Sequence, residues 1–360
     1  MTDHRIIQGD ALDALRTLPD RSAQCCITSP PYYQKRDYGI QGQIGLEKTP
    51  EAYVQKLVRV FQEVRRVLRP DGTLFLNIGD SYAGSGRGPT GKNGIGDQGK
   101  RQGFTDPGVI VPDGMKPKDL MGIPWILAFA LRADGWYLRS EIIWSKSNPM
   151  PQSVTDRPAT SHETIFMLSK SARYYYDVDG IREPAIGGGT RNARTVWTIN
   201  TQVRADGHYA SFPDEIPRRC ITTGTSEYGC CPKCGAPYNR IVEKTGGTIG
   251  QSWHPHADDE VTGQIGGMPT KGYKREFKGW QPGCKCDAGK PIPCVVIDPF
   301  MGSGTVAVVA RELNRSSVGI ELSPEYVKII RNRLQVDVRI DTGAITYQFD
   351  SVPAQRGECK

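Results

Sequence analysis

Two short segments near opposite ends of the chain have residue types that could do chemistry together. Near the amino terminus, an apolar run ends at Ser29-Pro30-Pro31-Tyr32. Consecutive prolines fix φ and remove backbone donors, so they predict that a strand stops in a rigid, extended turn. This turn presents a hydroxyl, carbonyl groups and an aromatic ring, which suit a planar substrate that has an amino group. A proline-stiffened surface turn is the structural alternative.

A Gly-rich turn follows a strand near the carboxyl terminus. The β-branched run 295–298 predicts a buried strand, and the apolar periodicity after residue 305 predicts a helix that reaches Leu313. Gly302 and Gly304 between them allow a tight turn and the close approach of a ligand, and the helix start offers unpaired N–H groups. The segment therefore predicts a cofactor-binding turn.

An acidic residue follows this turn at the end of the next predicted strand, residues 317–320. The carboxylate of Glu321 could accept hydrogen bonds from the two hydroxyls of a ribose. The spacing of Gly302, Gly304 and Ala307, with this acid further along, also fits a dinucleotide-binding fingerprint. The glycines alone leave both interpretations open.

The complete strings separate these interpretations. Asp298-Pro299-Phe300-Met301-Gly302-Ser303-Gly304-Thr305 resembles motif I of the DNA amino-methyltransferases, which binds S-adenosylmethionine, and Ser29-Pro30-Pro31-Tyr32 resembles their motif IV. Motif IV precedes motif I, as in the permuted, β-type members. Further similar pieces are Gly9-Asp10, residues 161–166 with Lys170 and Tyr174, and residues 208–213, which resembles motif X. The resemblance covers most of residues 1–220 and 293–335.

The family resemblance implies a site and a reaction. It implies that the target amine is bound by Ser29, Pro30, Pro31 and Tyr32. It implies that the cofactor is bound by Asp10, Phe212, Asp298, Phe300, Gly302, Gly304, Thr305 and Glu321. For the aromatic residues Phe212 and Phe300, a plain core position is the alternative. The target base would have to flip out of the duplex to reach this turn, and no covalent enzyme intermediate is needed.

The first residue of the Ser-Pro-Pro-Tyr turn bears on the target base. Ser29 resembles the subgroup that methylates N4 of cytosine, whereas Asp is usual for N6 of adenine. We therefore predict a cytosine-N4 DNA methyltransferase, with adenine-N6 as the alternative. Methylation of RNA or of a protein amide is a second alternative, which Asn at this position would have favoured. A zinc-ribbon nucleic-acid-binding protein with an inactive transferase core is the third.

Two close cysteine pairs have the spacing of metal ligands: Cys231 with Cys234, and Cys284 with Cys286. Four thiolates complete a structural zinc site, and an intracellular chain rarely uses such pairs as disulfides. We therefore predict structural zinc, with free thiols as the alternative. Substitute ligands could come from Cys230, His254 and His256. By contrast, Cys25 and Cys26 lie in an apolar strand and are expected to be buried.

The composition sets the size and the compartment. The chain has 360 residues, of which 38% are hydrophobic, enough for one large domain and a small module. The net charge of +7 is compatible with a polyanionic partner such as double-stranded DNA. No apolar run reaches 18 residues and no signal-peptide core is present, so we expect a cytoplasmic protein that does not bind membranes.

Helices alternate with short apolar strands along the chain. Predicted helices start at Pro50 and span residues 123–133, and predicted strands span 24–28, 73–78, 136–144 and 164–168. This alternation predicts an α/β fold with a mainly parallel sheet covered on both sides. With the family resemblance, we expect a Rossmann-like, S-adenosylmethionine-dependent methyltransferase with a small, zinc-ribbon-like insertion.

The predicted organisation has four parts. Residues 1–223 form the catalytic and target-contacting part, 224–292 the zinc-ribbon-like insertion, 293–345 the cofactor-binding part and 346–360 a tail. Within the first part, the Gly-rich and basic segment 81–118 is expected to be a mobile loop that contacts DNA, with a disordered excursion as the alternative. A separate restriction nuclease as partner and a homodimer are both compatible with the sequence.

Overall fold

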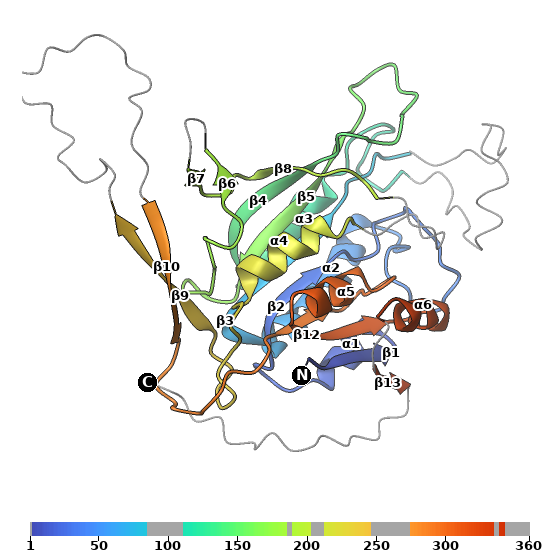
Figure 1. Ribbon diagram of the computed structural model, residues 1–360. Helices are drawn as coiled ribbons and strands as arrows, with labels where there is room; N and C mark the ends of the chain where they lie inside the picture. Colours follow the sequence, from blue (N-terminus) through green and yellow to red (C-terminus); the bar gives the residue numbers. More distant parts are fainter. Residues whose placement is uncertain are drawn as a thin grey trace, which may run out of the picture.

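The computed structural model describes residues 2–84, 111–185, 189–202, 212–245, 274–334 and 338–342. Among these residues, nine strands form one sheet in the order β13-β1-β12-β11-β2-β3-β5-β4-β8 (Figure 1). The strands of this sheet are β1 (His4–Gln8), β2 (Ala23–Thr28), β3 (Leu68–Ile78), β4 (Tyr137–Ser145), β5 (His162–Ser169), β8 (Val196–Thr198), β11 (Val295–Asp298), β12 (Ser316–Glu321) and β13 (Arg339–Thr342). All neighbouring strands are parallel except β5, which is antiparallel to β3 and β4.

Helices cover both faces of the sheet. The described helices are α1 (Ala11–Arg16), α2 (Pro50–Val67), α3 (Ile123–Ala133), α4 (Glu215–Gly224), α5 (Thr305–Glu312) and α6 (Pro324–Leu334). Apolar residues of α1, α2 and α3 form one core cluster with Cys26 of β2, whereas α4 and α5 form a second cluster with Cys25. Because successive strand residues point to opposite faces, the two clusters lie on opposite sides of the sheet. Both cysteines are fully buried, as predicted.

The predicted elements agree closely with the observed ones. Helix α2 starts at Pro50, where the Thr49 side chain accepts a hydrogen bond from the Ala52 N–H at 3.2 Å, and α3 spans the predicted residues 123–133. Strand β3 starts at Leu68, five residues before the predicted start at residue 73. The prediction of a mainly parallel sheet covered on both sides is confirmed, with β5 as the antiparallel strand.

The predicted insertion, residues 224–292, starts at the last residue of α4. Its described part contains strands β9 (Tyr238–Thr245) and β10 (Lys274–Pro282), which pair antiparallel and project from the body of the molecule (Figure 1). Arg240 on β9 forms an ion pair with Asp177 at 3.0 Å, and Arg275 on β10 forms one with Asp179 at 2.6 Å. These charge pairs attach the hairpin to the loop after β5. A further short pair, β6 (Glu183–Pro184) and β7 (Thr190–Arg191), lies beyond that loop.

Most of the predicted loop 81–118 and the whole predicted tail 346–360 lie outside the described residues. At the base of the loop, the Ala83 N–H donates to the Asp119 carbonyl at 2.8 Å, and the Lys118 N–H donates to the Ala83 carbonyl at 2.8 Å. The two ends of this segment therefore lie side by side. No helix in the described ranges is both long and apolar enough to span a membrane.

Candidate active site

The two predicted turns leave the same edge of the sheet from adjacent strands. Strands β2 and β11 are parallel neighbours, with Cys25 opposite Val296 and Cys26 opposite Ile297. Parallel strands end at the same edge, so the turn that starts at Ser29 and the Gly-rich turn after Asp298 lie side by side. Ligands of open α/β sheets bind at this edge.

Both turns line one cavity of about 720 Å³. From the predicted amine-binding set it is lined by Ser29, Pro30, Pro31 and Tyr32. From the predicted cofactor set it is lined by Asp10, Phe212, Asp298, Phe300, Gly302, Thr305 and Glu321. The segment after the Pro-Pro turn contributes Lys35, Arg36 and Tyr38, which the sequence interpretation missed. Residues 208–211 of the predicted motif X lie outside the described part of the chain.

Gly304 is the one member of the predicted cofactor set that does not line the cavity. It precedes α5 with a φ of +81°, and a Cβ there would lie 2.9 Å from the Ile330 side chain on α6. A side chain is disfavoured both by this backbone conformation and by the contact. Gly304 therefore turns the chain and lets α5 approach α6, while Gly302, with a φ of +52°, faces the cavity.

Two buried carboxyl groups hold the Gly-rich turn. Glu321 accepts hydrogen bonds from the Gly302 and Ser323 N–H groups, both at 2.8 Å. Asp298 accepts from the Phe300 N–H at 3.1 Å and from the Thr28 hydroxyl at 2.6 Å. Burial raises the pKa of each carboxyl to about 7, against the hydrogen bonds that lower it. Both groups therefore titrate near neutral pH when no ligand is bound.

Three other predicted cofactor residues also have structural roles. Asp10 caps α1, since its Oδ1 accepts from the N–H groups of Leu12 at 2.9 Å and Asp13 at 3.1 Å. Phe212 is 7% exposed and packs in the core cluster of α4 and α5, whereas Phe300 packs against the cluster on the other face. All three residues also line the cavity. Each of the two aromatic residues therefore packs against the core and contributes to the cavity wall at the same time.

A polar cluster that the sequence interpretation did not assign lies behind the Pro-Pro turn. The Tyr32 hydroxyl donates to Glu163 Oε2 at 2.6 Å and accepts from Asn77 Nδ2 at 2.8 Å. Lys146 Nζ donates to Glu163 Oε1 at 2.5 Å. The signal for Asn77 was a polar residue inside the apolar strand β3. Lys170 and Tyr174, which are part of the resemblance, do not line the cavity. Lys170 Nζ instead donates to the Leu68 carbonyl at 2.7 Å.

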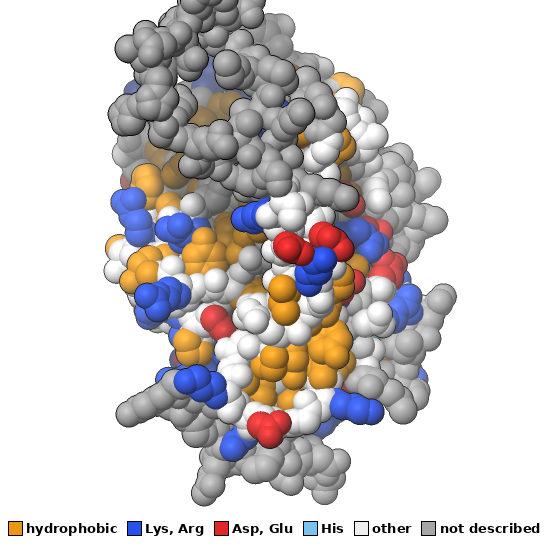
Figure 2. Space-filling model, turned by 60° about the vertical axis from the view of Figure 1, so that its left-hand side comes forward, with side chains coloured by type: hydrophobic (Ala, Val, Ile, Leu, Met, Phe, Trp, Pro, Cys, Tyr) orange, Lys and Arg blue, Asp and Glu red, His pale blue; other side chains and the backbone are white. Residues whose placement is uncertain are grey.

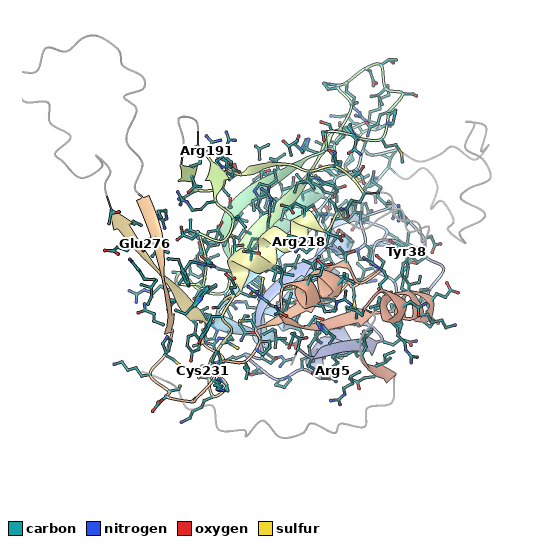
Figure 3. The ribbon with its side chains drawn as sticks, in the orientation of Figure 1. Arg5, Tyr38, Arg191, Arg218, Cys231 and Glu276 are labelled. Carbon is teal, nitrogen blue, oxygen red and sulfur yellow. The ribbon has the colours of Figure 1, made fainter. Side chains whose placement is uncertain are left out.

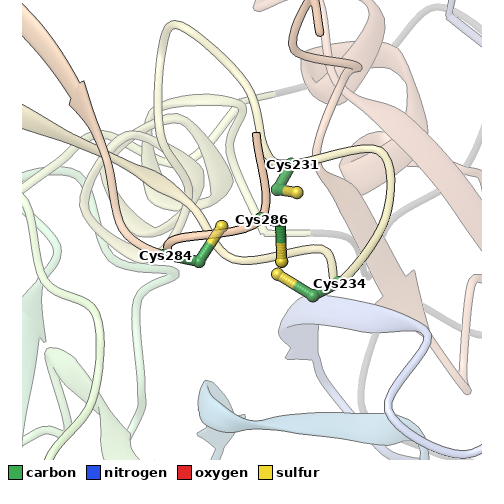
Figure 4. A group of neighbouring side chains, drawn as sticks. All are labelled: Cys231, Cys234, Cys284 and Cys286. Carbon is green, nitrogen blue, oxygen red and sulfur yellow. The ribbon is translucent and has the colours of Figure 1, made fainter. Parts of the chain in front are cut away.

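The four predicted cysteine ligands lie together. The sulfur atoms of Cys231, Cys234, Cys284 and Cys286 all lie within 4.8 Å of one another (Figure 4). Tetrahedral zinc with bonds of about 2.3 Å separates its sulfur ligands by about 3.8 Å, so the cluster has the size that this ion requires. Cys230 lies outside this cluster, with its sulfur 3.8 Å from the Pro293 carbonyl. His254 and His256 lie outside the described residues.

The cysteine cluster is separate from the cavity. In Figure 3, Cys231 lies at the opposite side of the molecule from Tyr38, which lines the cavity. On the face in Figure 2, Lys and Arg side chains are scattered among acidic and apolar ones and do not form a single basic patch. This face alone therefore does not locate a polyanionic partner.

Comparisons with known proteins agree with this geometry. Residues 23–231 and 294–332 match a family model described as DNA methylase. The chain is 44% identical over 333 residues to the Type II methyltransferase M.XycI of Xanthomonas campestris pv. cyanopsidis, and 43% identical over 333 residues to M.Cfr9I of Citrobacter freundii. Both alignments cover 92% of this chain and 87% of the relative.

Solved structures share the fold. The Thermus thermophilus protein TTHA0409, complexed with S-adenosyl-L-methionine, superimposes with a TM-score of 0.51 at 20% identity, over 95% of this chain and all of the other. The PvuII DNA methyltransferase, described as cytosine-N4-specific, superimposes with a TM-score of 0.54 at 15% identity, over 94% of this chain and 96% of the other. At these identities the likeness concerns the fold alone.

Proposed function

The chain belongs to the DNA methylase family of N6 and N4 amino-methyltransferases, and from this premise we propose that it methylates N4 of cytosine in duplex DNA after the base flips out. It is an S-adenosylmethionine-dependent DNA methyltransferase. The observation that carries the proposal is that the Ser29 turn and the Gly302 turn line one cavity.

The Pro-Pro turn can orient an amine. The lone pair of an exocyclic amine is delocalised into the ring, so the nitrogen attacks a methyl group only when it is held toward it and pyramidalises. Hydrogen bonds from its two N–H groups to Ser29 Oγ and the Pro30 carbonyl would hold it and stabilise the positive charge that develops on nitrogen. No side chain here has to form a covalent bond with the base.

The residues at the Gly-rich turn fit S-adenosylmethionine, which supplies an electrophilic methyl group when bound. The buried Glu321 carboxylate, held by two N–H groups, suits the hydroxyls of a ribose. Gly302 leaves open space on the cavity side, where a Cβ would meet nothing within 4 Å. Asp10, Phe212 and Phe300 complete the wall that would surround the cofactor.

Cytosine is favoured over adenine because the first residue of the turn is neutral. Ser29 offers an uncharged acceptor, whereas the Asp usual for adenine-N6 enzymes is charged. The enzyme should be incubated with methyl-labelled S-adenosylmethionine and duplex DNA of mixed sequence, after which the labelled DNA is digested to nucleosides. N4-methylcytosine supports the proposal, and N6-methyladenine would instead establish the alternative. No incorporation would favour a binding protein with an inactive core, which has less support because both turns line one cavity.

We propose that the four-cysteine cluster binds structural zinc. The turn that holds Cys231 and Cys234 is docked on the sheet: Arg69 donates to the Cys234 carbonyl, and Gln24 Nε2 donates to the Gly235 carbonyl at 3.0 Å. Gln24 Oε1 also accepts from the Val295 N–H at 2.6 Å. The metal would therefore fix a turn that contacts the starts of β2 and β3, and Gln24 links this turn to the start of β11.

The relatives named Type II methyltransferases suggest a biological setting for the enzyme. We propose that it protects DNA against a separate restriction nuclease that reads the same sequence. Co-expression would test this, since a nuclease from the same source should be tolerated only with the active methyltransferase. A homodimer stays a prediction, which sedimentation of the full chain would test.

A further inference from the structure

Glu163 on β5 contacts the Pro-Pro turn from outside the cavity. Its Oε2 accepts hydrogen bonds from the Tyr32 hydroxyl at 2.6 Å and from Asn77 Nδ2 at 3.0 Å. Its Oε1 lies 2.5 Å from Lys146 Nζ, and the side chains of this ion pair are 17% and 19% exposed. Ser29 Oγ lies 3.3 Å from the Tyr32 hydroxyl, so a continuous hydrogen-bonded chain runs from Ser29 to Glu163.

The Glu163 carboxylate determines which group donates in each hydrogen bond from Ser29 to Glu163. A carboxylate paired with Lys146 only accepts hydrogen bonds, so the Tyr32 hydroxyl must donate its proton to Glu163. Burial and the Glu163 charge raise the pKa of Tyr32 well above its ordinary value, so the hydroxyl keeps that proton. The oxygen of Tyr32 is then an acceptor for Ser29, whose own proton points away from the cavity. Asn77 Nδ2 also donates to Ser29 Oγ at 3.4 Å, which takes one lone pair of the hydroxyl. The other lone pair of Ser29 is left to face the substrate.

Packing holds the Tyr32 ring in the position this chain requires. A Cβ on Gly79 would lie 2.7 Å from the Tyr32 ring, so the ring lies directly against the backbone after β3. The next carbonyl of the turn is also fixed, because the Tyr53 hydroxyl donates to the Pro31 carbonyl at 2.8 Å. The turn therefore has few alternative arrangements.

We propose that Glu163 is a positioning residue that makes Ser29 an obligatory acceptor, and that it thereby selects a base with an amino group over one with a carbonyl group. The inference rests on the proposed function, since it assigns the preference to the same amine-binding turn. Glu163 acts through Tyr32 and Ser29, and it does not line the cavity itself.

The substitution Glu163→Gln keeps the size of the side chain, but the hydrogen bonds from Ser29 to residue 163 no longer have a fixed donor and acceptor. The Gln amide nitrogen can donate to the Tyr32 oxygen, which allows the Tyr32 and Ser29 protons to turn toward the cavity. If the Ser29 hydroxyl points its proton into the cavity, it faces the N–H donors of an amino group unfavourably, whereas it can donate to a carbonyl oxygen. Glu163→Asp keeps an acceptor at this position, and Glu141→Gln on β4 changes the same charge outside the cluster.

The experiment compares binding of two duplexes that differ in one group of the target base. After the methylated base has been identified, duplexes with cytosine or uracil at the target position, each opposite an abasic site, are titrated in the presence of sinefungin. If adenine is the target, hypoxanthine replaces uracil. We expect the wild type and Glu141→Gln to prefer the amino base at least tenfold, Glu163→Asp to retain most of this preference, and Glu163→Gln to reduce it below about threefold.

Kinetics and a double variant complete the test. For Glu163→Gln we expect kcat on DNA to fall at least tenfold, with the Kd for S-adenosylmethionine within twofold of the wild type. Tyr32→Phe breaks the same chain, so its effect on the preference should not add to that of Glu163→Gln. An unchanged preference in Glu163→Gln, or additive effects in the double variant, overturns the inference. A wild type that methylates no DNA amine would instead overturn the proposed function.

Discussion

The Thr28 hydroxyl donates a hydrogen bond to the Asp298 carboxylate at 2.6 Å. Thr28 is the last residue of β2 and Asp298 the last of β11, and their exposed fractions are 0% and 4%. This buried bond joins the strand that leads to the proposed amine-binding turn with the strand that leads to the proposed cofactor turn. The relative position of the two turns therefore depends on side chains inside the core.

Asp298 should make the ligand-free protein less stable as the pH rises. Its pKa is about 7 in the folded protein and near 3.8 when unfolded, so the folded state holds an extra proton between these values. Its stabilising contribution is complete below the unfolded pKa and is lost as the pH rises through 7. Asp298→Asn should therefore raise the Tm by about 1 to 3 °C more at pH 8 than at pH 5.5. Scanning calorimetry without cofactor measures this, and equal shifts at both values would contradict it.

Glu321 should make cofactor binding stronger as the pH rises. Its pKa is about 7 in the ligand-free protein, and the ionised carboxylate is the stronger acceptor for ribose hydroxyls. We expect S-adenosylmethionine to bind about fivefold more tightly at pH 8 than at pH 6. Glu321→Gln should weaken binding by about 10- to 100-fold and remove this pH dependence.

Isothermal titration calorimetry at both pH values measures these Kd values. Glu325→Gln changes an exposed charge on α6 and serves as the control. If Glu321→Ala binds S-adenosylmethionine as well as the wild type does, the ribose assignment is wrong.

Tyr32→Ala should weaken productive insertion of the base more than it weakens cofactor binding. The aromatic ring can stack on the flipped base, and such stacking is worth about 1 to 3 kcal/mol. The kcat/KM for DNA should fall by about 5- to 100-fold, while the Kd for S-adenosylmethionine stays within about twofold. Tyr137→Ala, on an exposed tyrosine of β4, is the matched control. Loss of cofactor affinity in Tyr32→Ala would place this residue in the cofactor site instead.

Removal of the metal should destabilise the protein. We expect one zinc ion per chain by mass spectrometry of the metal content, and none in Cys234→Ser. The turn that holds Cys231 and Cys234 is docked on β2 and β3. Protein from which a chelator has removed the metal should therefore have a Tm several degrees lower, and added zinc should restore the Tm. Cys220→Ala, a buried cysteine outside the cluster, should keep its zinc. A metal-free wild type would favour the alternative of free thiols.

The sequence predicted those features that depend on local pattern. The Pro-Pro and Gly-rich turns each follow an apolar strand, and the ends of parallel strands meet at one edge, so their proximity could be expected. The antiparallel orientation of β5 could not be predicted, because the apolar pattern of a strand does not indicate its direction in the sheet. Gly304 also shows a limit, since its contact with Ile330 arises from the packing of α6 and not from the glycine spacing.

The Glu163 cluster shows where sequence reasoning ends. Glu163 was part of a recognised segment, yet nothing in that segment indicates a partner. Its contacts with Tyr32 and Asn77 join residues 131 and 86 positions apart, on different elements of the sheet and its loops. Only the order of the strands, which places β3 between β2 and β5, brings these side chains together.

The place of β2 in the sheet has a consequence for synthesis of the enzyme. One edge of β2 pairs with β3, which follows it closely in the sequence. The other edge pairs with β11, which the ribosome makes about 270 residues later. Until then the nascent chain exposes a bare, apolar strand edge, which is prone to aggregate. A product truncated before residue 295 would lack this partner and the turn that follows it, so no activity can arise before β11 and the Gly-rich turn have been made.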